Sequence, residues 1–290
     1  MIHARPSRTA LGVARRRAAH QLLDDPLVLD DPLALPILGA GQRAALEASI
    51  RRRFPPSPEQ HPVARALRAF LVARARYAEE TLAAAAAGRV RQYVVLGAGL
   101  DTFAYRNALP GVRVFEVDHP ATQAWKRECL DEAAIRVPDG PAGVAFVPVD
   151  FHRDRLDERL IAAGFRPDEP AVFGWLGVTM YVAAESVRAV LRYALGRPAG
   201  SAIVFDYALA TAVMDPLQRI VHQRVADRVA RAGEPWITAF EPEALGRELT
   251  AMGARRVVDL DGTALNARYF AGRRDGLRVG SLARLMLAGT

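Results

Sequence analysis

Five short apolar runs are spaced along the middle of the chain, at residues 93–96, 112–117, 144–149, 171–176 and 202–205. A continuous apolar run of this length is typical of a strand that is buried on both faces, as in a parallel sheet. The stretches between them, at residues 121–134, 153–163 and 184–195, favour helices. Because parallel strands need helical crossovers, this alternation predicts a doubly wound α/β sheet.

The first 88 residues contain no such run and predict a helical lobe. Asp-Pro steps at Pro26 and Pro32, and a proline cluster at 55–58, interrupt any long helix in the first part of the lobe. Residues 61–87 then place apolar side chains at helical spacing and end before Gly88, which predicts one long helix. We therefore expect a helical lobe over residues 1–88 and a sheet domain over residues 89–290.

Residues 207–240 interrupt the alternation of strands and helices. They are rich in arginine and contain Met214, Pro216 and Trp236, so we expect a helical cap inserted after the fifth strand. Beyond the insertion, residues 243–252 predict a further helix. Residues 256–260 and 277–287 predict two late strands.

The composition is that of an ordinary globular protein, with 51% apolar and 24% charged residues. No apolar run approaches the roughly 20 residues needed to span a bilayer, and the N-terminal segment lacks a signal-peptide core. Cys129 is the sole cysteine, so an internal disulfide is impossible. These features predict a cytoplasmic protein that does not associate with a membrane.

The net charge of +7 raises the question of a nucleic-acid partner. Lys126 is the only lysine, and the arginines are spread along the whole chain, often beside acids. This distribution predicts solvated helix surfaces, so no nucleic-acid partner is expected. The six histidines never fall at metal-ligand spacing, so no metal site is expected either.

A glycine turn, Gly97-Ala98-Gly99, follows the first apolar run directly. Glycines let a ligand touch the backbone at the carboxyl end of a strand, where doubly wound sheets bind ligands. A dinucleotide would require a third glycine where Thr102 stands, and Asp101 would repel a phosphate at ~5 Å by roughly 1–3 kcal/mol. A ligand with a positive centre would tolerate Asp101. The alternative is that Asp101 only caps the next helix.

Two further strand ends carry acids. Asp118 closes the second run about 20 residues past the glycines, where an acid commonly accepts hydrogen bonds from two ribose hydroxyls. Glu116 shares its strand face. Asp150 and Phe151 follow the third run, where an acid and the next backbone N–H can bind an adenine ring. An ordinary exposed acid and a turn-forming aspartate are the respective alternatives.

The fourth run ends in Gly174-Trp175-Leu176-Gly177 and continues to Tyr181. Glycines on both sides of an aromatic residue at a strand end permit close approach of a substrate. Core packing explains Trp175 equally well, but it does not explain the two glycines together.

These segments together resemble the leucine carboxyl methyltransferase-like family, in its polyketide O-methyltransferase-like branch. The likeness runs nearly end to end and is carried by the motifs Leu-Gly-Ala-Gly-Leu-Asp-Thr (96–102), Phe-Glu-Val-Asp-His-Pro (115–120), Pro-Val-Asp (148–150), Trp-Leu-Gly-Val-Thr-Met-Tyr (175–181) and Asn-Ala-Arg-Tyr-Phe (266–270). The resemblance implies a Rossmann-like class I fold with a seven-stranded sheet, and S-adenosyl-L-methionine as cofactor.

By the same resemblance, Arg74 binds the methionine carboxylate, Gly97, Ala98 and Gly99 line the methionine and ribose, Asp118 binds the ribose diol, and Asp150 with the Phe151 amide binds the adenine. A guanidinium suits a carboxylate because the two can form paired hydrogen bonds. The chain departs from the family pattern twice. Phe151 replaces a leucine, and Leu176 stands where many relatives have a glutamate beside the cofactor amino group.

The predicted reaction is O-methylation of a small-molecule carboxylate or hydroxyl, such as a polyketide-type metabolite. A carboxylate acceptor is ionised at neutral pH and needs no base, whereas a hydroxyl usually does. No catalytic residue is identified; Tyr181 and Tyr207 follow the fourth and fifth strands and are candidates for the acceptor pocket, with core packing as the alternative. A catalytically silent binding module and an NAD(P)-dependent oxidoreductase stay open as other classes. The sequence gives no indication of the oligomeric state.

Overall fold

The computed structural model describes residues 8–52, 56–150, 153–231, 233 and 235–290. Within them a single seven-stranded sheet has the order β3-β2-β1-β4-β5-β7-β6, with β7 antiparallel to both of its neighbours. The strands are β1 (Gln92–Leu96), β2 (Arg113–Asp118), β3 (Val144–Pro148), β4 (Ala171–Trp175), β5 (Ala202–Asp206), β6 (Arg256–Asp261) and β7 (Arg284–Gly289). The sequence predictions of an α/β class and of seven strands are confirmed.

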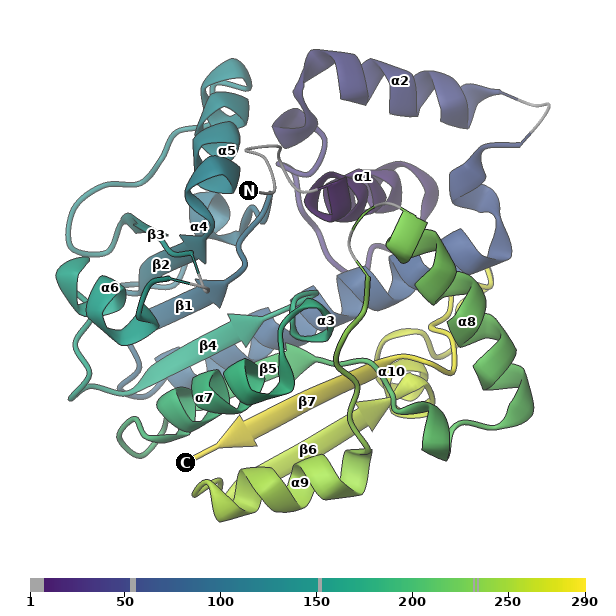
Figure 1. Cartoon of the computed structure of the whole chain (residues 1–290). Helices are drawn as coiled ribbons and strands as arrows, with labels where there is room; N and C mark the ends of the chain where they lie inside the picture. Colours follow the sequence, from purple (N-terminus) through teal and green to yellow (C-terminus); the bar gives the residue numbers. More distant parts are fainter. Residues whose placement is uncertain (1–7, 53–55, 151–152, 232, 234) are drawn as a thin grey trace.

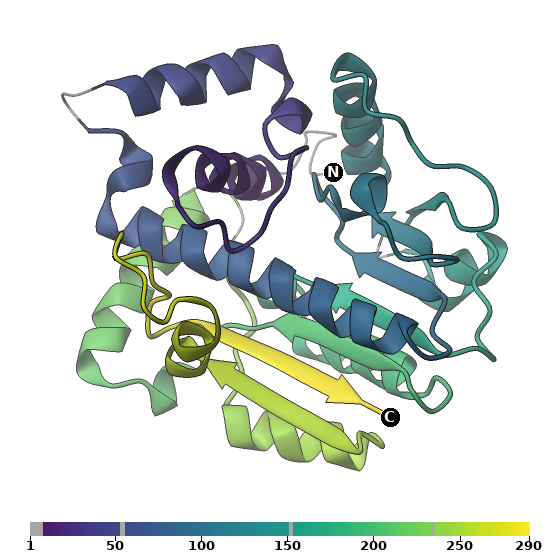
Figure 2. The same cartoon turned by 180° about the vertical axis from the view of Figure 1, so that it is seen from behind.

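Helices cover both faces of this sheet (Figures 1 and 2). One face carries α6 (Leu156–Ala162), α7 (Ala184–Leu195) and α9 (Pro242–Ala251), and the other carries α3 (Pro62–Ala86) and α10 (Gly262–Tyr269). Because successive strand side chains point to opposite faces, β1 contributes side chains to the cores on both faces of the sheet. Val94 packs into the core under α6 and α7, whereas Tyr93 and Val95 pack into the core that contains Leu82 of α3.

The N-terminal part is helical, with α1 (Arg8–Leu23), η1 (Pro36–Leu38), α2 (Gly39–Arg51), η2 (Pro58–Gln60) and α3. Pro62 occupies the first turn of α3, where its missing N–H costs nothing, and the His61 ring accepts a hydrogen bond from Val63 N at 3.3 Å. The inner face of α3 packs directly on the sheet beside β5 and β7, while α1 and α2 lie beyond it.

The remaining elements are α4 (Phe103–Arg106), α5 (Pro120–Glu132), η3 (Thr179–Tyr181) and, after β5, η4 (Thr211–Val213) and α8 (Pro216–Arg231). A backbone bridge between Leu209 and Phe240 closes the segment that contains α8. Within the described ranges, no helix is both long and apolar enough to cross a bilayer.

Two details at the C-terminal end differ from the sequence prediction. The expected strand over 277–287 begins only at Arg284, because Leu277 and Val279 are buried in an irregular segment and Val279 exchanges hydrogen bonds of 2.8 and 3.0 Å with the Asn266 amide. The pattern also gave no indication of α10. That helix begins after Asp261, whose side chain accepts a hydrogen bond from Ala264 N at 2.8 Å and so caps it.

Candidate active site

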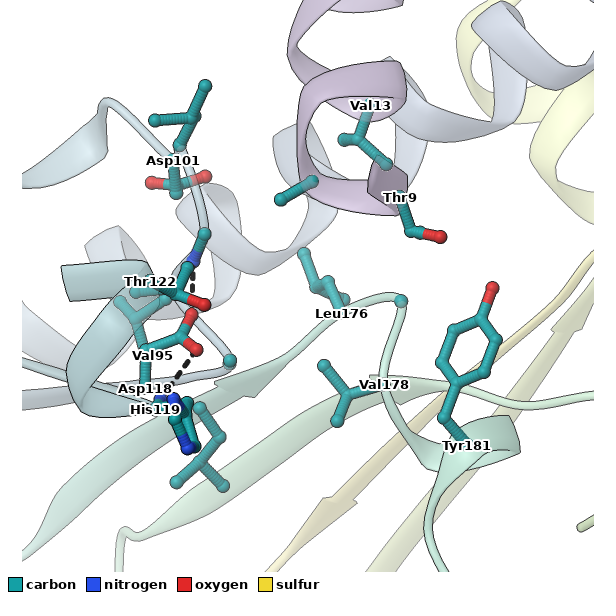
Figure 3. Close-up of a pocket in the computed structure, with 18 of the residues that line it drawn as sticks. Thr9, Val13, Val95, Asp101, Asp118, His119, Thr122, Leu176, Val178 and Tyr181 are labelled. Atoms are coloured by element: carbon teal, nitrogen blue, oxygen red, sulfur yellow. Dashed lines mark hydrogen bonds between the residues drawn. The ribbon is translucent and has the colours of Figure 1, made fainter. Parts of the chain in front are cut away.

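A cavity of about 640 Å³ opens at the carboxyl ends of β1, β2 and β4 and extends beneath α1 and α3. This is the edge at which doubly wound sheets bind ligands. Figure 3 shows Asp101, Asp118 and His119 on one side of the cavity, Leu176, Val178 and Tyr181 on the other, and Thr9 and Val13 of α1 above them. Its volume is within the range of small-molecule and cofactor sites.

The glycine turn after β1 forms part of the cavity wall. Gly97 and Gly99 have φ angles of 68° and 46°, a conformation that favours glycine. A Cβ on Gly97 would lie 2.4 Å from a Val178 methyl, and one on Gly99 would lie 3.1 Å from the Ala10 Cβ of α1. The turn therefore requires glycine for its backbone conformation and for the close approach of its neighbours.

Asp118 lies at the end of β2, and its carboxylate faces the same turn (Figure 3). It accepts hydrogen bonds from Gly99 N at 2.6 Å and from His119 N at 2.7 Å. Burial raises the pKa of Asp118, although these two N–H donors partly oppose the shift. The carboxylate is thus fixed at the cavity wall while two hydrogen bonds leave it further acceptor sites.

Asp150 also lines the cavity, just past β3. Its backbone N–H donates to Asp154 at 2.9 Å, which begins a turn toward α6. Phe151, predicted to offer its backbone N–H to adenine, lies outside the described residues.

Arg74 projects from α3 into the cavity and carries a built-in counter-ion. Its Nη1 donates to Asp206 Oδ2 at 2.5 Å, and the other oxygen of Asp206 accepts from Gly177 N at 2.5 Å. Asp206 ends β5 and is 1% exposed. This acid is not among the site residues predicted from the sequence. It follows an apolar run, as Asp118 does, and that shared pattern was the available signal.

Asp101 has a charged partner, Arg17, that was not predicted from the sequence. Its carboxylate forms an ion pair with Arg17 of α1 at 2.5 Å and accepts a hydrogen bond from Phe103 N at 2.8 Å. Burial, the largest single effect, works against its ionisation, but the charges of Arg17, Lys126 and Arg106 and the Phe103 N–H together lower the pKa of Asp101 to about 2. Asp101 is therefore ionised, and Arg17 balances its charge. The hydrogen bond from Phe103 N, in the first turn of α4, agrees with the alternative that Asp101 caps this helix.

The two candidate acceptor tyrosines lie in different places. Tyr181 lines the cavity beside Val178. Tyr207 is not among the lining residues: it is 3% exposed, packs against Phe205 and Phe240, and donates its hydroxyl to Asp259 at 3.0 Å. The prediction that Tyr207 borders the acceptor pocket is therefore wrong. Neighbouring strand side chains point to opposite faces, so Tyr207 points to the face opposite that of Asp206.

Leu176 lines the cavity next to Gly177 and packs against the core beside α3, so an apolar side chain stands at this position of the wall. Across the described part of the chain, no three histidine, cysteine or acidic side chains gather into a set that could hold a metal ion.

Comparison with known proteins shows the family. Residues 10–194 match the model of the family described as leucine carboxyl methyltransferase. The provisionally named S-adenosyl-L-methionine-dependent methyltransferase YktD of Bacillus subtilis (strain 168) is 32% identical over 93% of both chains. A similarly named relative of Frankia alni is 36% identical over 63% of this chain and 62% of its own length. The chain belongs to the leucine carboxyl methyltransferase family, which confirms the family and the cofactor predicted from the sequence.

Solved structures agree on the fold. A DUF574 family protein from Streptomyces avermitilis superposes with a TM-score of 0.56 at 19% identity over 96% of both chains. A protein from Thermobifida fusca, provisionally described as a methyltransferase, gives a TM-score of 0.56 at 18% identity over 100% of this chain and 96% of its own. At these identities the likeness concerns the Rossmann-like fold.

Proposed function

We propose that this chain is an S-adenosyl-L-methionine-dependent methyltransferase that methylates an oxygen of a small molecule. The observation that carries the proposal is the order of groups along the sheet edge. Reading across β3, β2, β1 and β4, the cavity presents Asp150, Asp118, the glycine turn and then Gly177 beside Arg74. That is the order of adenine, ribose, sulfonium and amino-acid carboxylate in the cofactor.

Each group along this edge has the chemistry that its part of the cofactor requires. Asp118 accepts from the two ribose hydroxyls, and Asp150 accepts from the adenine amino group. Arg74 donates paired hydrogen bonds to the carboxylate. The glycine turn lets the backbone approach the ribose and methionine portion. The residues present fit an adenosyl amino acid.

The bound cofactor supplies an electrophilic methyl group, so the chain's own contribution is to position the acceptor and exclude water. Beyond the glycine turn, most of the described wall is apolar, formed by Val13, Leu71, Val178, Val182 and Ile237 with Tyr181. Such walls suit an acceptor with an apolar body and a single reactive oxygen. A small carboxylate or a polyketide-type phenol has this character, and the carboxylate arrives already ionised.

Two other functions remain as outcomes of the test. A silent binding module finds its support in Leu176, which offers no charge to the cofactor amino group. An oxidoreductase on the same fold is disfavoured by membership of the methyltransferase family.

The sole cysteine, Cys129, is buried and free, which supports a cytoplasmic site of action.

Calorimetric titration tests the proposal directly. We expect S-adenosyl-L-methionine and S-adenosylhomocysteine to bind at micromolar concentrations, and NADPH not to bind. Arg74→Met and Asp118→Asn should each weaken binding at least ten-fold. A panel of small acids and phenols, assayed with radiolabelled cofactor, then identifies the acceptor. Absence of cofactor binding up to millimolar concentrations overturns the proposal, and binding without turnover across the panel favours the silent module.

A further inference from the structure

The ion pair between Arg74 and Asp206 places a full negative charge directly behind the cation that faces the cavity. Arg74 lines the cavity and Asp206 does not; the acid is 1% exposed and lies 2.5 Å from the guanidinium. A second 2.5 Å hydrogen bond, from Gly177 N, holds the other carboxylate oxygen. Hydrogen bonds to both carboxylate oxygens thus fix the orientation of Asp206.

This arrangement treats a simple anion and a zwitterion differently. A carboxylate that binds Arg74 from the cavity side is attracted by the guanidinium and repelled by Asp206 behind it. An ammonium group carried beside that carboxylate is attracted by Asp206 and offsets the repulsion. Burial strengthens both effects because little water lies between the charges to screen them.

The other acids of the described cavity wall are poorly placed for the same task. Asp101 is neutralised by Arg17 of α1. Asp118 ends β2, which lies three strand positions from β5 in the sheet order, a separation of about 14 Å at ~4.8 Å per strand. Asp150 lies one strand farther away, past β3. Leu176, next to Gly177, carries no charge.

We propose that Asp206 is a specificity-determining residue that makes the Arg74 end of the cavity select a zwitterionic amino acid over a ligand with a carboxylate alone. The pair of Arg74 and Asp206 is itself a fixed zwitterion, complementary to the α-amino-acid end of the cofactor. This inference rests on the proposed function, because it takes Arg74 as the partner of the methionine carboxylate.

Three ligands that share the adenosyl group separate the contributions of the carboxylate and of the ammonium group to binding. S-adenosylhomocysteine carries both charges, its deaminated analogue carries the carboxylate alone, and 5′-methylthioadenosine carries neither. Calorimetry on the wild-type protein should give at least ten-fold tighter binding of S-adenosylhomocysteine than of the deaminated analogue. Equal or tighter binding of the deaminated analogue overturns the inference, and this result needs no variant.

Asp206→Asn then tests the charge itself. We expect the preference for S-adenosylhomocysteine over the deaminated analogue to shrink at least ten-fold, with less than a two-fold change for 5′-methylthioadenosine. If Asp206 merely holds Arg74 in position, both carboxylate ligands weaken by the same factor and the preference persists, which overturns the inference. Asp259→Asn is the matched control, because Asp259 also pairs with an arginine, Arg284 at 2.8 Å, but does not line the cavity; it should keep the wild-type preference.

The same titrations distinguish the two proposals. If the wild-type protein binds neither S-adenosylhomocysteine nor 5′-methylthioadenosine, the proposed function fails. If it binds both while Asp206→Asn leaves the preference intact, only the role assigned to Asp206 fails.

Discussion

Arg17 in α1 forms a partly buried ion pair with Asp101 in the turn after β1, with 2.5 Å between Nη1 and Oδ2. Its other terminal nitrogen donates to Asp31 at 2.8 Å and to Thr102 at 3.1 Å. One arginine of the N-terminal helices therefore holds the segment that follows the glycine turn, through groups 84 and 85 residues away in the sequence. The helices above the cavity and the glycine turn below it are thus parts of one polar network.

This network predicts acid sensitivity. The pKa of Asp101 falls from 3.8 to about 2 on folding, so the ionised Asp101 with its surrounding cations contributes stability above the unfolded pKa and loses it as the pH falls toward 2. The contribution at neutral pH is about 2 kcal/mol. Asp101→Asn should lower the free energy of unfolding by about this amount at pH 6. The difference from wild type should shrink progressively between pH 4 and pH 2 in urea titrations.

Asp157→Asn is the control for this experiment. Asp157 pairs with Arg155 at 2.8 Å, but that arginine is largely exposed, so the loss should be no more than about 1 kcal/mol. Equal losses for the two variants would show that the pair of Arg17 and Asp101 stabilises the fold no more than an exposed pair does. A loss at Asp101 that is unchanged in acid would show that the stabilisation does not come from the charge of Asp101.

The core of the fold was predictable because its strands are continuous apolar runs, which only a sheet covered on both faces can bury. The prediction was weaker near the C-terminus. Leu277 and Val279 are as apolar as strand residues, but Asn266 takes up the backbone hydrogen bonds of Val279 in an irregular segment. Tertiary contacts decide which group forms hydrogen bonds with the backbone of a residue such as Val279. The pattern of apolar residues along the chain carries no information about those contacts.

The same distinction applies to the candidate site. Strand-end acids and turn glycines are visible in sequence, since the topology alone brings strand ends to one edge. Pairings between distant elements are not visible, so the counter-ions Arg17 and Asp206 were missed. Tyr207 was a candidate for the acceptor pocket because it follows a strand end. Side chains alternate between the two faces of the sheet, however, so Tyr207 points away from Asp206 and into the core under α7 and α9.

Gly177 has a φ of 79°, and a Cβ there would lie 2.7 Å from Arg74 Nη2. The guanidinium cannot move aside freely because Asp206 holds its other nitrogen. Gly177→Ala should therefore weaken S-adenosylhomocysteine binding at least ten-fold in calorimetry, besides costing about 1–2 kcal/mol of stability from the backbone conformation.

Gly272→Ala isolates the backbone cost. Gly272 has a φ of 72°, and a Cβ at this position would meet nothing within 4 Å, so this variant should lose comparable stability and keep wild-type affinity. A cofactor affinity that falls equally in both variants would assign the effect to general strain and not to displacement of Arg74.

Asp118 predicts how cofactor affinity depends on pH. Because burial raises its pKa, Asp118 should protonate in the ligand-free protein at a higher pH than an ordinary aspartate. Protonation removes the charge that would strengthen the proposed hydrogen bonds from the ribose hydroxyls to Asp118. Affinity for S-adenosylhomocysteine should therefore decline as the pH falls through mildly acidic values. Asp118→Asn should bind more weakly and with a flatter profile; parallel profiles would place the titrating group elsewhere.

Tyr181 and Tyr207, both candidates from the sequence, should respond in opposite ways to removal of the hydroxyl. Tyr181 lines the cavity, so Tyr181→Phe should change the KM for the acceptor found in the panel several-fold while the Kd for S-adenosylhomocysteine stays the same. Tyr207 donates to Asp259 within the core, so Tyr207→Phe should cost about 1 kcal/mol of unfolding free energy and leave acceptor kinetics unchanged. Steady-state kinetics and urea titration on both variants separate the roles. A change in acceptor KM at Tyr207 and none at Tyr181 would mean that the acceptor enters from the opposite face of the sheet.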